Sequence, residues 1–192
     1  QVDVPSQLSS HETITREWRS LRIPADAPSG NAELMLPDGT IIRRYRIESL
    51  PMMTDQPDYE ITVGETFPGV GELVGYSLSE AITLDTPPEV TLLWQAGDSP
   101  SEVSYTVFVQ LLNADGRVIA QSDALPMSGS RPTTGWREGE YIEDRHVLAY
   151  NDLASTGEAT LIVGMYDATN NQRLRLADES DYVILADEVE IR

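Results

Sequence analysis

The chain has 192 residues, of which 40% are hydrophobic, so it is long and apolar enough to bury the core of one large domain. Its net charge is −19 and all 13 basic residues are arginines, which argues against nucleic acid and anionic membrane surfaces as partners, because basic patches bind both. The absence of cysteine excludes disulfides, thiolate metal sites and a cysteine nucleophile. No apolar run approaches the roughly 18 residues that span a bilayer, so we expect no direct membrane insertion of this segment.

The N-terminal part of the chain is predicted to contain a few short strands. Residues 1–12 are polar and are expected to fray. Strands are predicted over residues 16–23, with Trp18 as an anchor, and over residues 32–36 and 41–47, with a turn at residues 37–40. Residues 51–57 combine Pro, Asp and Thr with little periodicity, which is typical of a linker. We therefore divide the chain into N-terminal strands, residues 1–54, and a main domain, residues 55–192.

The clearest element is a β-hairpin over residues 105–123. Tyr105, Val107 and Val109 lie at alternating apolar positions, so this face of the first strand is expected to point into a core. Asp115-Gly116 then supplies a residue that tolerates positive φ, as a short hairpin turn requires, and the chain returns as the partner strand.

The rest of the main domain is predicted to consist of further strands separated by turns. They cover residues 59–63, 73–78, 89–96, 141–150, 161–167, 172–176 and 182–191. The loop over residues 125–139 is long enough to be either functional or packed by its own side chains. No segment shows a helical period over eleven or more residues, and about ten short strands are typical of an all-β fold. The sequence predicts a two-sheet antiparallel β-sandwich of immunoglobulin-like or jelly-roll type.

A short internal repeat connects the two parts of the chain. Residues 30–34 (GNAEL) match residues 157–161 (GEATL) at an offset of 127, and Leu21 matches Leu148 in the same register. Residues 13–50 are therefore interpreted as the closing strands of a preceding, truncated copy of the sandwich. The alternative explanation of this short match is chance, or the similar alternation of apolar residues that β-strands share.

Five segments of the main domain carry a family resemblance. They are LVGYSL at residues 73–78, WQA at 94–96, YTVFVQLLNADGRVIAQSDALP at 105–126, RPTTGWREGEYIEDRHVL at 131–148 and LIVGMYDATNNQRL at 161–174. In order and spacing they resemble the β-sandwich domain at the C-terminal, extracytoplasmic end of some bacterial membrane glycosyltransferases. Those enzymes are of the polyprenyl-phosphate-dependent, protein-mannosyltransferase-like type, and the resemblance covers about residues 66–192.

The resemblance implies a non-catalytic accessory domain, periplasmic or at the cell surface, attached to the membrane part of its own parent protein. The catalytic part of such enzymes is a multi-helix membrane region, and nothing in this sequence matches it. The sandwich also occurs in tandem in that family, in agreement with the internal repeat. We expect the domain to bind or position glycan or a lipid-linked sugar. The alternatives are a structural spacer or protein-interaction module without a ligand, and a glycoside hydrolase.

The candidate ligand-binding residues are Arg131, Trp136, Asp144 and His146, together with Asp123. An indole face that stacks on a sugar ring, with an arginine and an aspartate to fix hydroxyl groups, is the usual chemistry of a sugar site. The structural alternative is that Trp136 packs the long loop onto the sheet. In that alternative, an Arg131–Asp123 or Arg137–Asp144 ion pair is structural.

Paired carboxylates raise the hydrolase alternative. Asp123, Glu143 and Asp144 would suit glycoside hydrolysis if two of them were held about 5–10 Å apart. The structural alternative is that these residues cap turns or pair with arginines, for which Arg131, Arg137 and Arg145 are the candidates. A Ser/His/Asp triad is not predicted, because no Gly-x-Ser-x-Gly motif occurs.

No cofactor is predicted, and calcium is the only metal that the sequence leaves open. The two histidines, His11 and His146, lack zinc-ligand spacing, and His146 is expected to be a buried, hydrogen-bonded histidine. Loop carboxylates and carbonyls are the natural ligands of calcium. The candidate sets are Asp178, Glu179 and Asp181, or Asp167 with Asn170.

Overall fold

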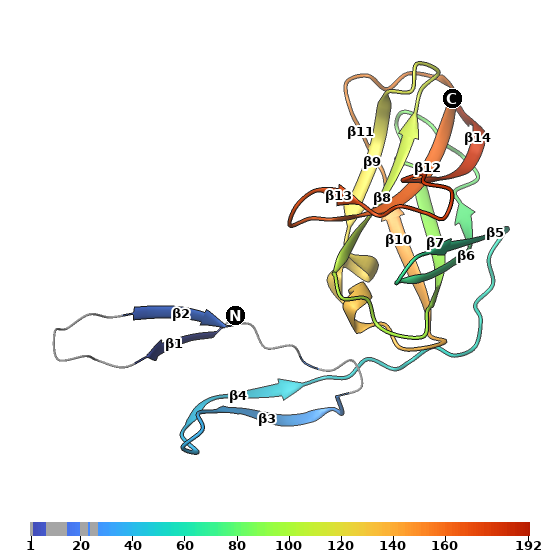
Figure 1. The fold of residues 1–192 in the computed structure, drawn as a ribbon. Helices are drawn as coiled ribbons and strands as arrows, with labels where there is room; N and C mark the ends of the chain where they lie inside the picture. Colours follow the sequence, from blue (N-terminus) through green and yellow to red (C-terminus); the bar gives the residue numbers. More distant parts are fainter. Residues whose placement is uncertain (1, 7–14, 20–22, 24–26) are drawn as a thin grey trace. The chain divides into compact units, whose positions relative to one another are not determined.

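The computed structural model describes residues 2–6, 15–19, 23 and 27–192 and divides the chain into two units, Gln1–Ser49 and Leu50–Arg192 (Figure 1). The boundary expected between residues 54 and 55 therefore falls inside the second unit. Residues 50–54 belong to the sandwich because their backbone is bonded to it: the Met53 carbonyl, for example, accepts a hydrogen bond of 2.8 Å from the Tyr141 N–H.

The described strands of the first unit form two antiparallel pairs. Strand β1 (Val2–Ser6) pairs with β2 (Thr15–Arg19), and β3 (Gly30–Met35) pairs with β4 (Ile41–Ile47). The expectation that residues 1–12 fray is wrong for residues 2–6, which form β1. Residues 7–12 and the side chain of Trp18, predicted to be an anchor, lie outside the described part of the chain.

The second unit is a β-sandwich of two antiparallel sheets, as predicted (Figure 1). The first sheet has the strand order β10 (Tyr141–Val147), β7 (Glu89–Ala96), β6 (Gly71–Leu78) and β5 (Ile61–Phe67). The second has the order β11 (Ala149–Tyr150), β9 (Val118–Ala124), β8 (Tyr105–Leu112) and β12 (Gly157–Asp167). On its outer side, β12 pairs with both β13 (Gln172–Arg173) and β14 (Val183–Ile191).

The chain moves between the sheets in Greek-key fashion. The orders β8–β12–β14 and β10–β7–β6 match the C–F–G and E–B–A orders of immunoglobulin-like sandwiches, the first of the two predicted types. The single strand expected over residues 141–150 is wrong: β10 belongs to the first sheet, and β11 pairs with β9 in the second. The chain crosses at Leu148, whose N–H bonds to the Pro88 carbonyl and whose side chain is buried between the sheets.

The core is built from the inward faces of both sheets. The alternation in β7 places Leu92 and Trp94 inside, and the alternation in β8 does the same for Val107 and Val109, as predicted; all four are 0% exposed. The β8–β9 hairpin also forms at the predicted turn, with Gly116 at φ +74°. One hydrogen bond of 2.8 Å, from the Tyr76 hydroxyl to the Leu185 carbonyl, ties β6 of the first sheet to β14 of the second.

The outer face of β8 is covered as well. Phe108 is 1% exposed, and the Arg173 guanidinium lies 4.4 Å from the centre of its ring. Opposite it on β12, a Cβ at Gly164 would approach the Phe108 ring to 2.2 Å, so this position needs glycine. The described helical segments are the 3₁₀ turns η1 (Pro126–Gly129) and η2 (Thr133–Gly135). No helix in the described part of the chain has the length and apolar character needed to cross a bilayer.

Candidate functional site

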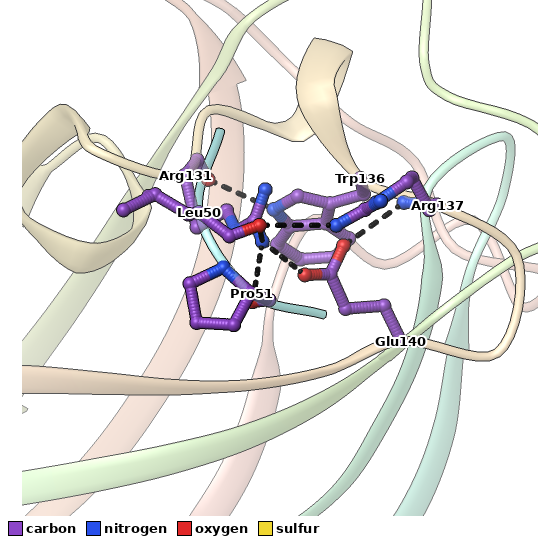
Figure 2. A network of polar contacts seen from close by, with 6 residues as sticks. All are labelled: Leu50, Pro51, Arg131, Trp136, Arg137 and Glu140. Carbon is purple, nitrogen blue, oxygen red and sulfur yellow. Dashed lines mark hydrogen bonds and ion pairs between the residues drawn. The ribbon is translucent and has the colours of Figure 1, made fainter. Parts of the chain in front are cut away.

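The predicted site residues separate into two polar groups and one outlying carboxylate. Arg131 and Trp136 belong to the first group, which we call the linker clasp. It consists of Arg131, Trp136, Arg137 and Glu140 with the carbonyls of Leu50 and Pro51 (Figure 2). Asp144 and His146 belong to the second group, the sheet-bridging relay, together with Ser122. Asp123 is in neither group.

Trp136 holds the long loop of residues 125–139 onto the core. It follows the η2 turn, its side chain is 1% exposed, and its ring centre lies 6.1 Å from that of Trp94. Its indole N–H donates to the Arg131 carbonyl at 2.8 Å, which closes the loop on itself. No face of this ring is open for stacking on a sugar, so in this structure Trp136 has the packing role that was the alternative to ligand binding.

The ion pair of the clasp is buried. The Arg131 Nη2 lies 2.7 Å from the Glu140 Oε1, and their side chains are 10% and 2% exposed. The second carboxylate oxygen, Oε2, accepts the Arg137 backbone N–H at 3.1 Å. Both oxygens of Glu140 are therefore satisfied, which a carboxylate removed from water requires.

The remaining donors of the clasp bind the chain segment that enters the sandwich. Arg131 Nη2 donates to the carbonyl oxygens of Leu50 and Pro51 at 3.2 and 2.9 Å. Arg137 Nη2 donates to the same Leu50 oxygen at 3.2 Å, so the two guanidinium groups converge on one carbonyl (Figure 2). Arg131, which was expected to fix sugar hydroxyls, is occupied here by Glu140 and by backbone carbonyls of the protein itself.

The partners predicted for these arginines are wrong. Arg131 pairs with Glu140 and not with Asp123, and Asp144 bonds to His146 and not to Arg137. Glu140 was missed because its side chain reaches Arg131 only through the conformation of the intervening loop. Its one local signal is Gly139 at φ +70°, which allows the tight turn that bonds the Glu140 N–H to the Arg137 carbonyl.

The sheet-bridging relay joins β10 to β9. The Asp144 Oδ2 lies 3.0 Å from the His146 Nε2, and the His146 Nδ1 lies 3.1 Å from the Ser122 Oγ. Asp144 and His146 are each 1% exposed, as expected for a buried, hydrogen-bonded histidine. A neutral imidazole with its proton on Nε2 satisfies both bonds, because it donates to the carboxylate and accepts from the hydroxyl.

A left-handed turn supports the relay from the loop side. The second oxygen of Asp144, Oδ1, accepts the Met127 N–H at 2.8 Å. Met127 and Ser128 have φ values of 51° and 53°, a conformation that non-glycine residues adopt at a cost. The bond to Asp144 helps to offset that cost, so the carboxylate has a structural role in holding the start of the loop.

The relay resembles a Ser–His–Asp triad with the imidazole reversed. In serine hydrolases the serine bonds to Nε2 and the aspartate to Nδ1, whereas here Ser122 faces Nδ1 and Asp144 faces Nε2. No sequence motif predicts this arrangement, because the three residues come from two different sheets. The burial of His146 and the use of both Asp144 oxygens suit a link between the sheets.

Asp123 lies apart, on the outer face of β9. Its β8 neighbour is Phe108. Desolvation by the surrounding protein raises the pKa of the Asp123 carboxyl, and the charge of Arg173 acts in the opposite direction. The carboxylate partner that the hydrolase alternative needs is Asp144, which is buried and bonded to His146 and Met127. Glu143, the third carboxylate of that alternative, is solvent-exposed on β10.

Two of the candidate calcium ligands, Asp178 and Asp167, cap turns. Asp178 Oδ1 accepts the N–H and the hydroxyl of Ser180, and these bonds lower the pKa of Asp178. Asp167 Oδ1 binds Thr169 in the same way, with the same effect on its pKa. Among the described residues, no three His, Asp or Glu side chains gather closely enough to hold a metal ion.

One pocket was not anticipated from the sequence. It measures about 260 Å³ and lies beside β6 and β14, where Tyr76, Ile82 and Val189 form its apolar wall and Glu188 and Arg192 are among its polar lining residues. Its volume is below the roughly 300–1,000 Å³ usual for small-molecule sites.

The clasp and the relay are both arrangements in which polar groups bind other groups of the same chain. The clasp fixes an incoming backbone segment, and the relay joins two sheets. Comparison with known proteins adds no relative: no family model, no curated protein and no solved structure matches this chain.

Proposed function

We propose that the sandwich of residues 50–192 is a non-catalytic spacer module that anchors the segment entering it, within a larger extracytoplasmic protein. The observation that carries this proposal is the clasp: Arg131 and Arg137 donate to the carbonyls of Leu50 and Pro51, and Arg131 is also paired with the buried carboxylate of Glu140. A buried ion pair is costly to desolvate, so it is best explained by a demand for one fixed geometry. Here that geometry fixes where the chain enters the sandwich.

The same observation makes the spacer a better proposal than the glycan-binding domain. A sugar site needs an accessible aromatic face and polar groups that are free to bind hydroxyls. Trp136 is 1% exposed, and the donors of Arg131 are used by Glu140 and by the linker carbonyls. The polar groups that suggested a ligand therefore support attachment of the linker.

The wider context of the proposal is a membrane glycosyltransferase-like parent protein, with this chain outside the cytoplasm. What supports it is the order of the five segments between residues 73 and 174 and their resemblance to the accessory domains of such enzymes. In this context the partner of the module is the membrane part of its own parent. The coding sequence that flanks this segment tests the context, because a run of upstream transmembrane helices is expected and its absence would remove the proposed parent.

The anchoring role is tested by opening the clasp. Replacement Arg131→Gln removes the ion pair and two carbonyl contacts, so proteolytic cleavage within residues 50–57 should become faster, by about tenfold if roughly 1.4 kcal/mol of anchoring is lost. Arg145→Gln is the matched control, because Arg145 pairs with Glu89 at the surface, where ion pairs contribute little. Equal cleavage rates in the two variants would contradict the proposal.

The glycan alternative is tested separately by titration. Hexoses, cell-wall oligosaccharides and lipid-linked sugars are added while the indole N–H signals of Trp136 and Trp94 are followed by NMR. Both rings are buried, so we expect neither signal to move. Saturable movement of the Trp136 signal, abolished by Arg131→Gln, would favour the glycan-binding function over the spacer.

A further inference from the structure

Strand β14 forms one margin of the second sheet (Figure 1). Among the described strands it pairs with β12 alone, so its second edge has no partner strand. The Tyr76 hydroxyl bonds to this edge at the Leu185 carbonyl, at 2.8 Å. The Arg192 N–H, just past the strand, bonds to the Ile82 carbonyl at 3.0 Å. Between these two bonds, no described segment other than β12 bonds to the backbone of residues 186–191, so this part of the edge is open.

The pocket of about 260 Å³ lies along the open edge. Four residues of β14 line one side of it, and residues 78–83, at the end of β6 and in the loop that follows, line another. Its apolar wall consists of Tyr76, Ile82 and Val189, all of which belong to the hydrophobic core. The pocket is small for a cofactor or metabolite, but a single long side chain needs less room.

A β-bulge shapes the β14 side of the pocket. Ala159 pairs with Val189 and Leu161 pairs with Ala186, so three steps along β14 match two steps along β12. The extra residue interrupts the alternation of side chains between the two faces of the strand. As a result, Glu188 and Val189 both line the pocket although they are consecutive in the sequence.

The rim of the pocket carries negative charge. Glu80, Glu188 and Glu190 line it and are exposed to solvent. The basic lining residue is Arg192, and its guanidinium is already paired with Glu190 at 2.8 Å. In the described part of the chain, no basic side chain pairs with Glu80 or Glu188. A positively charged occupant is therefore favoured over a neutral or acidic one.

Charges and bulges on an edge strand also hinder the pairing of edges between molecules, and the carboxylates of β14 have that effect on acidic or neutral strands. That role does not require an apolar pocket beside the edge. The combination of an open edge, an apolar pocket and an acidic rim instead selects among strands, because it repels acidic ones and attracts cationic ones.

We infer that the open edge of β14 and the pocket beside it form a docking site for a cationic, extended segment of a partner protein. The segment pairs with β14 as a further strand, and one of its lysine or arginine side chains enters the pocket. The aliphatic stem of that side chain packs on Tyr76, Ile82 and Val189, and its charged head reaches Glu188. None of these residues belongs to the linker clasp, so the docking site goes beyond the anchoring role and can fail independently of it.

Peptide titrations of the 192-residue chain, followed by NMR, test the docking site. The probe acetyl-KTVKVTK-amide should shift the amide signals of residues 186–190 saturably, because it adds a strand beside them. Replacing its central lysine by norleucine keeps the stem and removes the charge, so binding should weaken about fivefold or more. Methylating alternate backbone nitrogens removes the donors that pair with β14, so binding should be lost. No saturable shift with the probe, or unchanged affinity of either altered peptide, would overturn the inference.

Two neighbouring substitutions show whether the pocket itself binds the peptide. Glu188→Gln removes a carboxylate that lines the pocket, whereas Asp187→Asn removes one that is also exposed but does not line it. Both change the net charge of the protein by one, so they weaken long-range attraction equally. Glu188→Gln should weaken binding of the probe about fivefold or more, and Asp187→Asn by less than about twofold. Equal effects would show that the peptide responds only to overall charge, and would overturn the proposed site.

Discussion

Glu140 is the residue on which the linker clasp depends. It lies immediately before β10, its carboxylate is buried, and it accepts from both Arg131 and the Arg137 backbone. Removing one member of a buried pair leaves the other charge without compensation in a poorly solvated place, which is costlier than losing the pair as a whole.

We therefore expect Glu140→Gln to lower the free energy of unfolding by about 3 kcal/mol, the lower end of the range for a broken buried ion pair. Urea denaturation of the variant and the parent protein measures this loss of unfolding free energy. Glu89→Gln is the control, because the Glu89–Arg145 pair is at the surface and its loss should cost less than about 1 kcal/mol. If both substitutions cost the same, the clasp does not have the stabilising role described above.

Asp123 should give stability a dependence on pH. Its pKa is raised in the folded state by desolvation, so the folded protein holds this proton more tightly than the unfolded chain does. The stabilisation that follows is complete below the unfolded pKa, near 3.8, and is lost as the pH rises through the folded value.

The variant Asp123→Asn cannot lose that proton, so it should be more stable than the parent protein at pH 7, and the difference should vanish near pH 3. Thermal melts across this range measure the effect, and Asp115→Asn in the exposed hairpin turn is the control. A difference that stays constant with pH would show that the Asp123 carboxyl is not the titrating group.

Among the elements, the loop of residues 125–139 depends most on one side chain. Trp136 fills space beside Trp94 and bonds to the loop backbone, so Trp136→Ala removes both a large volume and a hydrogen bond. We expect a loss of about 3–5 kcal/mol in unfolding free energy. Trp136→Phe should cost less, since it keeps most of the packing. A loss below 1 kcal/mol for Trp136→Ala would mean that the loop is held by other contacts.

The sheet-bridging relay between β9 and β10 also leads to a prediction about the reactivity of Ser122. A fluorophosphonate labels serines whose hydroxyl is activated by a base beside an oxyanion hole. In the relay, Ser122 faces Nδ1 of a fully buried His146, and the backbone N–H of Met127 is already bonded to Asp144. We expect no labelling of Ser122, measured by intact mass against Ser122→Ala. Stoichiometric labelling that this substitution abolishes would contradict the proposed non-catalytic role.

The elements differ in how far the sequence predicts them, and the reason is the range of the interactions involved. The β8–β9 hairpin was predicted in place, because its alternation and its Asp115-Gly116 turn are local signals. The division of residues 141–150 at Leu148 was missed, since its apolar pattern continues while the strand changes sheet.

The candidate site shows the same limit. Arg131, Trp136, Asp144 and His146 were predicted from the sequence, and all four are in polar networks. They were expected to form one cluster, however, and their partners Glu140 and Ser122 were not predicted. Side chains from a loop and two sheets become neighbours only through tertiary packing. Their spacing along the chain therefore does not predict which of them are in contact.

At the scale of the whole molecule, the position of the boundary between the units has a direct consequence. Residues 50–54 were assigned to the N-terminal part, and residues 51–57 to a linker, yet Leu50, Pro51 and Met53 supply carbonyls that the sandwich binds. A chain of residues 50–192 should melt at the temperature of the second unit in the intact chain, because every clasp contact is kept. A chain of residues 55–192 should melt several degrees lower, as a loss of about 1–2 kcal/mol implies. Calorimetry on both chains measures this, and identical melting temperatures would place the boundary after residue 54.

The clasp also determines how a stretching force enters the sandwich. Tension transmitted from residue 49 reaches Leu50 first, where Arg131 and Arg137 hold the carbonyl, and only later the edge strand β5. The hydrogen-bonded ladder of β5 is therefore shielded from peeling until the clasp opens. Because the Arg131–Glu140 pair is buried and little screened, the rupture force should vary little with salt concentration. The clasp is in this sense a mechanical stop that the force must open before it reaches the edge strand β5.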